Sequence, residues 1–505
     1  MLLNSAQRRI GADNYQDAVK TNRRRVLSDA ALPDAAGIYW GYGRLEGEDP
    51  VRVGLIGTGY QGRAHIGAIN PDYLKIVAFS DIRPSSQRQT RMLLKDKFGA
   101  QVAEDIPLYE NYQDLLKDDR VEMVIIALPL HLHYLATRDA LLAGKHVLCE
   151  KLMARKVSEC KELIRTAHTA RRLLGVGHQR HYSYLYADCR AIIEQGRVLG
   201  DVRHIRAYWH RNQTNAGAKN AEEGLYDGWR PDVPAEDQSV DLKKFDYASC
   251  EELVQWRAYS RTGGGLMAEL GSQQLDAASF LLGGKHPTAV HGTGLLSFFD
   301  QNPPTDPREV DDHIFLTFEY GQDANNAVVT YSSIDTNAFE GYGEQAMGTR
   351  GTLIVQEERD AYVFREPELN EIGSMRDTRV SWDPEPESPP ATQPASSALW
   401  VNGGEIPGPL TSRGYREEQE HMAWLIRNPD AIVWPSEENP YPENDADVAK
   451  ARGVPRCHGR VALANAVVAI VANMAMDPNS KHRYIQFKPE WFDAESDSTP
   501  EKDPA

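Results

Sequence analysis

Short apolar runs alternate with helical patterns over the first third of the chain. The apolar runs cover residues 51–56, 76–80, 121–127 and 146–150, and the helical patterns cover 63–69 and 132–143. Strands that alternate with helices in this way predict βαβ units and a parallel sheet. We therefore expect residues 51–175 to form one doubly wound α/β domain.

The pattern changes after about residue 200, where strand-like runs follow one another with turns and inserts between them. These runs cover 202–209, 289–297, 313–320, 327–333 and 352–356, and two helices are expected near 266–282 and 460–476. Successive strands without regular crossover helices indicate a largely antiparallel sheet. Residues 176–492 are therefore expected to form a second domain.

Four segments depart from these regular patterns. Residues 1–50 are expected to be an N-terminal arm with helical pieces, and residues 493–505 a polar, frayed tail. The excursion at 367–409 is rich in proline, which is typical of an extended surface segment, and wrapping of a neighbouring subunit is one hypothesis for it. The glycine-containing stretch at 337–344 is expected to be a structural loop between strands.

A glycine-rich turn joins the first predicted strand to the first predicted helix. It reads Gly57-Thr58-Gly59-Tyr60-Gln61-Gly62, and Asp81 follows about 20 residues further on. The first glycine permits a tight turn, the second lets a pyrophosphate approach the backbone, and the third allows close packing. The helix N-terminus then offers N–H groups to the phosphates. This context predicts a dinucleotide-binding Rossmann domain; the other interpretation is a glycine turn in a domain that binds no nucleotide.

Asp81 and Arg83 bear on the choice between NAD and NADP. A carboxylate at Asp81 would accept hydrogen bonds from the adenosine ribose and repel a 2′-phosphate, which favours NAD. Arg83 could instead contact a 2′-phosphate or stack on adenine. We expect NAD as the cofactor, with NADP as the alternative.

Composition and charge limit the classes of partner. The 505 residues include 56 Lys and Arg against 73 Asp and Glu, for a net charge of −17. An acidic chain repels phosphate backbones, so a nucleic-acid partner is not expected. No run approaches the ~20 continuous apolar residues of a membrane span, so a membrane partner is not expected either.

The cysteines and the N-terminus bear on the compartment. Five cysteines are widely spaced without a C-x-x-C pair, which argues against a disulfide framework and a structural zinc site, and no other metal motif is present. The run Arg23-Arg24-Arg25 resembles the start of a twin-arginine export signal. Asp29 and Pro33 interrupt the apolar region that such a signal needs. We expect a cytoplasmic protein that binds no metal and keeps its N-terminal arm.

Several polar residues follow predicted strands or begin a predicted helix. Leu128-Pro129 and His133 follow one strand, Glu150-Lys151-Leu152 follow the next, and Gly263-Gly264-Gly265 lead into a helix with Glu269, Gln273 and Asp276. Together with the glycine turn, these residues resemble those of the Gfo/Idh/MocA oxidoreductase family, from about Val51 to the C-terminal helix. The resemblance implies an NAD(P)-dependent enzyme acting on sugars, inositols or related polyols. It also implies a C-terminal α/β domain with an open, mainly antiparallel sheet, through which dimers or tetramers form.

The resemblance further implies that Lys151, Glu269 and Gln273 are catalytic. The chain departs from the family where Leu152 replaces a proline, and where Glu269 and Gln273 replace an Asp and a His. An i, i+4 pair lies on one helix face, so both side chains can point at one substrate. An amide does not titrate, so the proton step is expected to fall on Lys151 or on a histidine from elsewhere. A helix-surface charge is the other interpretation of Glu269.

Further residues are assigned to cofactor and substrate. The residues expected to contact the cofactor are Gly57, Thr58, Gly59, Tyr60, Gln61, Gly62, Asp81, Arg83, Leu128, Pro129, His133, Glu150 and Lys151. The residues expected to contact the substrate are Arg180, His181, Tyr182, Trp209, His210 and Arg211. Aromatic rings beside polar side chains suit a sugar, although such residues at strand ends also serve as ordinary packing residues.

Three functions remain open on the sequence. The first is an NAD-dependent dehydrogenase that oxidises or reduces a secondary alcohol of a sugar, glycoside or polyol by hydride transfer. The second is a redox-neutral, NAD-dependent glycoside hydrolase or lyase of the same fold. The third is a nucleotide-binding sensor without catalysis. Fold analogy does not choose between the first two.

Overall fold

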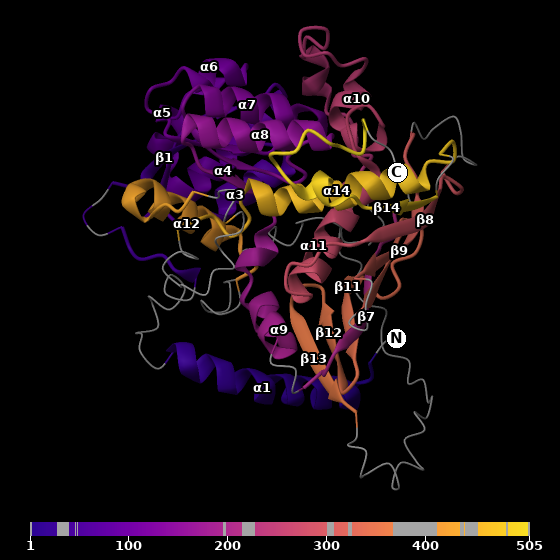
Figure 1. The fold of residues 1–505 in the computed structure, drawn as a ribbon. Helices are drawn as coiled ribbons and strands as arrows, with labels where there is room; N and C mark the ends of the chain where they lie inside the picture. Colours follow the sequence, from indigo (N-terminus) through magenta and orange to yellow (C-terminus); the bar gives the residue numbers. More distant parts are fainter. Residues whose placement is uncertain are drawn as a thin grey trace, which may run out of the picture.

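Two β-sheets organise the molecule (Figure 1). The computed structural model describes residues 3–27, 40–45, 47, 49–194, 198–214, 228–299, 308–321, 326–366, 412–434, 439, 453–480 and 483–502. One sheet is parallel and belongs to the N-terminal half, and the other is mixed and belongs to the C-terminal half.

The first sheet has six parallel strands in the order β3-β2-β1-β4-β5-β6. The strands are β1 (Val51–Ile56), β2 (Leu74–Ser80), β3 (Leu108–Tyr109), β4 (Met123–Ile126), β5 (His146–Cys149) and β6 (Leu174–Val176). The helices between them are α3 (Tyr60–Ala68), α4 (Pro84–Phe98), α5 (Ala100–Asp105), α6 (Tyr112–Leu116), α7 (His133–Leu142) and α8 (Val157–Ala170). This strand order is that of a dinucleotide-binding domain, and the predicted Rossmann fold is confirmed.

The apolar runs of the sequence explain the central strands. All four residues of β4 are buried, as expected for a strand that helices cover on both faces. The strand order reverses between β1 and β4. Ligands bind at such a switch point, at the carboxyl ends of the strands, because the two crossover connections diverge there.

The second sheet has eight strands in the order β13-β12-β11-β7-β10-β9-β8-β14. The strands are β7 (Val202–His210), β8 (Ala289–Leu295), β9 (His313–Tyr320), β10 (Ala327–Ile334), β11 (Tyr342–Gly348), β12 (Gly351–Gln356), β13 (Asp360–Arg365) and β14 (Tyr484–Gln486). The β7–β10 pair is parallel and the other pairs are antiparallel. Burial alternates along β10, so one face is covered and the other is open. The predicted open, mainly antiparallel sheet is confirmed.

One prediction about this sheet is wrong in part. The stretch 337–344 was expected to be a loop, and residues 337–341 form one between β10 and β11, but β11 begins at Tyr342 and pairs with β12. A Cβ on Gly343 would lie 2.2 Å from the carbonyl oxygen of Val355. Glycine is therefore needed there for close strand pairing, and the residue that indicated a loop belongs to a strand.

Helices cover the inner face of the second sheet and join it to the first domain. They include α9 (Tyr184–Glu194), a π-helical turn η7 (Met267–Gly271) that continues into α11 (Ser272–Leu281), α14 (Gly459–Met476) and α15 (Pro489–Phe492). The short helix α10 (Cys250–Val254) lies apart from this sheet and contacts η6. Short 3-10 turns are η2 (Leu130–Leu132), η3 (Gln179–Tyr182), η5 (Ala235–Ser239), η6 (Trp256–Ala258) and η11 (Pro429–Ala431). Helix α14 runs from α8 to β8 and so contacts both domains (Figure 1). It has the length and apolarity of a membrane span, but 78% of it is buried inside the protein.

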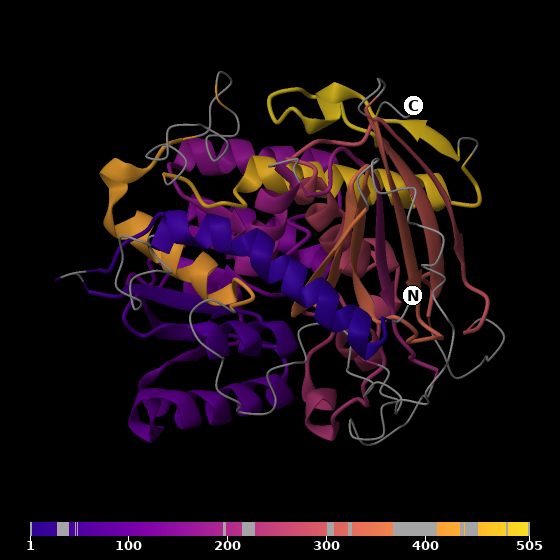
Figure 2. The same ribbon diagram turned by 90° about the horizontal axis from the view of Figure 1, so that it is seen from below.

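The described part of the N-terminal arm includes a long helix, α1 (Ser5–Leu27), which lies beneath β13 and α9 (Figure 1). Tyr15 and Val19 are buried, and Asn14 Nδ2 donates a hydrogen bond of 3.0 Å to the carbonyl oxygen of Val363. Seen from below, α1 crosses the molecule to the edge of the second sheet (Figure 2). The arm therefore covers the edge strand β13, which would otherwise expose unpaired backbone groups.

A late segment returns to the first domain. Helix α12 (Tyr415–Arg427) places Met422 and Leu425 in the same apolar cluster as Val53 of β1. A division of the chain at residue 176 does not anticipate this return. The proline-rich excursion at 367–409, which precedes α12, lies outside the described residues, and its proposed wrapping role stays a hypothesis.

The prediction of a frayed tail is wrong for residues 493–502. Lys161 of α8 is 2% exposed, and its Nζ donates to the carbonyl oxygens of Glu490, Ser496 and Ser498 at 2.8, 2.9 and 2.7 Å. A buried ammonium group needs such acceptors, since leaving it without them costs several kcal/mol. The polar tail is therefore held in place as the partner of one buried lysine.

Candidate active site

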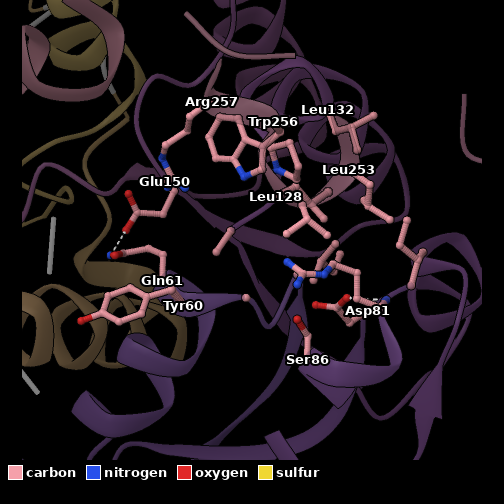
Figure 3. Close-up of a pocket in the computed structure, with 18 of the residues that line it drawn as sticks. Tyr60, Gln61, Asp81, Ser86, Leu128, Leu132, Glu150, Leu253, Trp256 and Arg257 are labelled. Atoms are coloured by element: carbon pink, nitrogen blue, oxygen red, sulfur yellow. Dashed lines mark hydrogen bonds between the residues drawn. The ribbon is translucent and has the colours of Figure 1, made fainter. Parts of the chain in front are cut away.

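A cavity of about 730 Å³ opens at the carboxyl ends of β1, β2, β4 and β5. Both domains line it. Figure 3 shows Glu150, Gln61 and Arg257 grouped at one end, with Asp81 and Ser86 at the other. This is the switch point of the first sheet, where the sequence placed a dinucleotide.

The three glycines of the turn each meet a different steric requirement. Gly57 has φ +83°, and a Cβ there would lie 2.5 Å from the carbonyl oxygen of Ala127. A Cβ on Gly62 would lie 2.1 Å from the carbonyl oxygen of Gly57, whereas at Gly59 no described atom lies within 4 Å. The space above Gly59 is thus open at the N-terminus of α3, where a phosphate can approach the backbone.

Asp81 is fixed at the end of β2. Its Oδ2 accepts a hydrogen bond from the backbone N–H of Thr58 at 2.8 Å, and its Oδ1 accepts one from the N–H of Arg83 at 2.8 Å. Burial raises the pKa of Asp81, although these two N–H groups act in the opposite direction. The guanidinium of Arg83 pairs with Asp237 at 2.8 Å.

Glu150 accepts two side-chain hydrogen bonds at the opposite end of the cavity. Gln61 Nε2 donates at 2.6 Å and His65 Nε2 at 2.8 Å, while Gln419 Nε2 of α12 donates to His65 Nδ1 at 3.0 Å. Gln419 thereby selects the His65 tautomer that carries its proton on Nε2. Burial acts to raise the pKa of Glu150, but His65, Lys151 and Gln61 hold it at about 2.

The three residues proposed as catalytic all line the cavity. Lys151 Nζ donates to the carbonyl oxygen of Glu269 at 2.6 Å, and Glu269 Oε2 accepts from Arg257 Nε at 2.7 Å. Gln273 Nε2 donates to Gln179 Oε1 at 2.9 Å. Burial lowers the pKa of Lys151, against the charges of Glu269 and Glu150, which favour the ammonium form.

Two further features of this end of the site are the pKa of Glu269 and the packing of Leu152. Burial acts to raise the pKa of Glu269, but the charges of Arg257 and Lys151 keep it below its usual value. The Lys151–Leu152 peptide is cis, and the Leu152 side chain is 2% exposed. The leucine that stands in place of the family's proline thus packs into the core.

His133 lines the cavity but uses both of its ring nitrogens elsewhere. Nδ1 lies 2.7 Å from the carbonyl oxygen of Leu152, and Nε2 lies 2.8 Å from that of Leu128. Burial acts to lower the pKa of His133, but Cys149 and the two carbonyl acceptors raise it to about 9. The imidazolium thus links the loops that follow β4 and β5.

The first cluster expected to bind substrate lies away from the cavity. Arg180 is buried between Glu344 at 2.9 Å and Glu358 at 2.8 Å. The other two residues of the cluster, His181 and Tyr182, bond to Asp276 and His421 respectively. The structure corrects the expectation for these three residues, because they do not line the cavity and each bonds to a partner inside the protein.

Of the second cluster expected to bind substrate, only one of its three residues lines the cavity. Trp209 lines the cavity, and its ring stacks on Tyr342 with centroids 4.4 Å apart. His210 lies between the carbonyl oxygen of Phe339 and Ser332 Oγ, and the Arg211 guanidinium pairs with Asp335 at 2.7 Å. These two residues stabilise the sheet and do not line the cavity, so the substrate role expected for them is also corrected.

Sequence reasoning missed several residues that line the cavity. Trp256 and Arg257 on η6 contribute an indole and a guanidinium, with Arg257 Cζ 4.2 Å from the Trp256 ring centroid. An aromatic residue beside a polar one, shortly before Gly263, was a signal that could have found them. Tyr247 and Tyr415 also line the cavity, and Tyr415 carried no signal because it follows the proline-rich excursion.

Two models of one protein family match the two domains of this chain separately. A family model described as an oxidoreductase family with an NAD-binding Rossmann fold matches residues 51–178, and a model of that family's C-terminal alpha/beta domain matches residues 191–394. An uncharacterized oxidoreductase of Schizosaccharomyces pombe is 27% identical over 50% of this chain and 57% of its own length. An inositol 2-dehydrogenase/D-chiro-inositol 3-dehydrogenase of Lactiplantibacillus plantarum is 31% identical over 30% of this chain and 43% of its own.

A solved structure shares the fold. The inositol dehydrogenase homolog of Azotobacter vinelandii, complexed with NADH and myo-inositol, aligns with a TM-score of 0.55 at 17% sequence identity. The alignment covers 87% of this chain and 98% of that one. The strand order, the glycine turn and the two family matches together show that this chain belongs to the Gfo/Idh/MocA oxidoreductase family, with an NAD(P)-binding Rossmann domain and a C-terminal α/β domain.

Proposed function

We propose that the protein is an NAD-dependent oxidoreductase that transfers a hydride between nicotinamide and a secondary alcohol of a sugar, glycoside or polyol. The observation that carries the proposal is the place of Lys151, which lines the same cavity as the glycine turn and lies beside Glu269. The similar proteins named as inositol dehydrogenases support a cyclic polyol or a sugar as substrate.

The residues at the glycine turn fit the cofactor. The open space at Gly59 and the N-terminus of α3 would hold the pyrophosphate, and the Asp81 carboxylate would hold the adenosine ribose. When bound, the cofactor supplies the hydride chemistry. A carboxylate repels a 2′-phosphate, and on this ground we propose NAD rather than NADP.

The remaining residues bind substrate and move its proton. Lys151 would take the hydroxyl proton, because burial lowers its pKa and so favours the neutral amine that acts as a base. Gln273 would orient a second hydroxyl without exchanging a proton. Trp209 and Trp256 offer aromatic faces to the C–H face of a ring.

Incubation with NAD and a panel of inositols, free sugars and glycosides tests the proposal. We expect NADH to accumulate with at least one of these alcohols, with much slower accumulation in the Lys151→Met variant as the matched control. Glycoside cleavage without net NADH would instead support the redox-neutral hydrolase or lyase. Neither reaction, with NAD still bound, would support the nucleotide-binding sensor.

We also propose a dimer or tetramer formed through the open face of the second sheet. Leu295, Phe315 and Tyr484 are 46%, 40% and 49% exposed, and their strand registers place them on one face. Large apolar side chains gathered on one open face are typical of an interface. Light scattering at micromolar concentration is expected to give an oligomer, and Phe315→Arg is expected to shift it towards monomer. A monomeric wild type would contradict this proposal.

Finally, we propose a cytoplasmic location. All five cysteines lie in the described part of the chain and none forms a disulfide, and four of them are buried. Thiols in this state are typical of a reducing compartment.

A further inference from the structure

A segment of the second domain, residues 228–262, lies over the cofactor end of the cavity; we call it the strap. It includes α10, which rises beside the first domain in Figure 1. Three ion pairs tie it to the first domain, each with an N–O distance of 2.8 Å: Arg83–Asp237, Arg88–Glu236 and Lys244–Glu110. In two of these pairs the strap supplies the carboxylate, so Asp237 and Glu236 bring negative charge to the region around Arg83.

Asp237 makes the most buried of these contacts. Its side chain is 0% exposed, and its Oδ2 accepts from Arg83 Nε at 2.8 Å and from Ser85 Oγ at 2.7 Å. Its Oδ1 accepts from the backbone N–H of Ser85, in the first turn of α4, at 2.9 Å. A guanidinium, a hydroxyl and a helix N-terminal N–H thus converge on one carboxylate, and donors of these kinds also bind phosphate groups.

The same donors lie next to the expected ribose site. The backbone N–H of Arg83 bonds to Asp81 Oδ1 at 2.8 Å, while the Arg83 side chain bonds to Asp237. Arg83, Ser85 and Ser86 line the cavity together with Asp81. A phosphate on the 2′-oxygen of a ribose held by Asp81 would therefore meet these donors first.

We propose that Asp237 selects NAD over NADP by occupying, as an internal carboxylate, the position that a 2′-phosphate would take. The proposal rests on the NAD-dependent function and extends it to a residue of the other domain. Arg83 is present, but its charge is already satisfied. A 2′-phosphate would have to displace a buried carboxylate or lie beside it, and both are unfavourable.

A purely structural role for Asp237 makes a different prediction. If Asp237 served only to anchor the strap, its loss would weaken NAD and NADP to the same extent. If it occupies the phosphate position, its loss would favour NADP alone. Glu236 provides a matched control, because it anchors the same strap through Arg88, whose side chain is 56% exposed, and makes no bond to Ser85.

The experiment compares NAD and NADP dissociation constants, measured by calorimetry, for the wild type, Asp237→Ala, Asp237→Asn and Glu236→Ala. We expect the preference for NAD over NADP to fall about 10- to 100-fold in Asp237→Ala, the value of about one hydrogen bond to a charged group. The Asp237→Asn variant keeps the side-chain volume and is expected to shift in the same direction. In Glu236→Ala the preference is expected to stay within about twofold.

Three results would overturn the proposal. An equal loss of affinity for both cofactors in the two Asp237 variants would make the residue an anchor only. A wild type that prefers NADP would show that the carboxylate does not exclude the phosphate. A wild type that binds neither cofactor would contradict the proposed function itself, which separates that failure from the other two.

Discussion

Replacing Lys151 with methionine is expected to lower turnover about 10²–10⁴-fold, the usual contribution of a general acid–base group. Methionine keeps the length and apolar bulk of the side chain but removes the titrating nitrogen and its hydrogen bond to the Glu269 carbonyl. The glycine turn and Asp81 are untouched, so the NAD dissociation constant is expected to stay near that of the wild type. Steady-state kinetics and calorimetry on the same preparation measure the two effects separately.

The pH profile gives this prediction a second readout. A lysine acts as a base only in its neutral form, and burial lowers the pKa of Lys151 below its usual value of 10.5. Wild-type turnover in the oxidative direction is therefore expected to rise with pH up to this lowered pKa and then level off. In Lys151→Met the residual rate is expected to lose this rise.

Gln273→Ala is the control, and it is expected to cost less, because the amide orients a group without moving a proton. Turnover of Lys151→Met within a few-fold of the wild type would place the base elsewhere. Among the described residues that line the cavity, His133 is the only histidine, and both of its ring nitrogens face backbone carbonyls. The structure thereby reduces the number of histidines that could act as the base in place of Lys151.

Features set by local sequence were predictable. The turn was recognised because two of its requirements are local: Gly57 has a positive φ, and a Cβ on Gly62 would meet the carbonyl oxygen of Gly57. The apolar run of β4 and the alternation along β10 likewise follow from which faces are covered. The fold class and the residues at the cofactor end of the site could therefore be predicted from local sequence patterns.

Features set by distant partners were not predictable. Arg180 and Trp209 stand in similar aromatic and polar surroundings in the sequence, yet Trp209 lines the cavity and Arg180 lies between two buried carboxylates. Only the pairing of β11 with β7 and β12 brings Glu344 to Arg180. Asp237 and Gln419 likewise act on the first domain from segments whose return to it depends on tertiary packing.

Replacing Arg180 with methionine is expected to lower the free energy of unfolding by about 3–5 kcal/mol, because it leaves buried carboxylates without their partner. Arg180 lies 2.9 Å from Glu344 and 2.8 Å from Glu358, and Glu358 also pairs with Arg413 at 3.0 Å. Glu344 is therefore the carboxylate that mainly loses its cationic partner in Arg180→Met. Urea unfolding of the apoprotein measures it, and a stable variant with only a raised KM would restore the substrate role that the sequence suggested.

A second substitution separates the effect of the unpaired Glu344 charge from the other effects of Arg180→Met. Glu344→Gln in the Arg180→Met background removes the unpaired carboxylate, keeps its volume, and is expected to recover part of the lost stability. Burial already raises the pKa of Glu344 to about 7 against the pull of Arg180, so losing the guanidinium raises it further. A carboxyl whose pKa is higher in the folded state destabilises that state as pH rises above its unfolded value. The deficit of Arg180→Met is therefore expected to be smaller at about pH 5 than at about pH 8, and the Gln variant is expected to remove most of that difference.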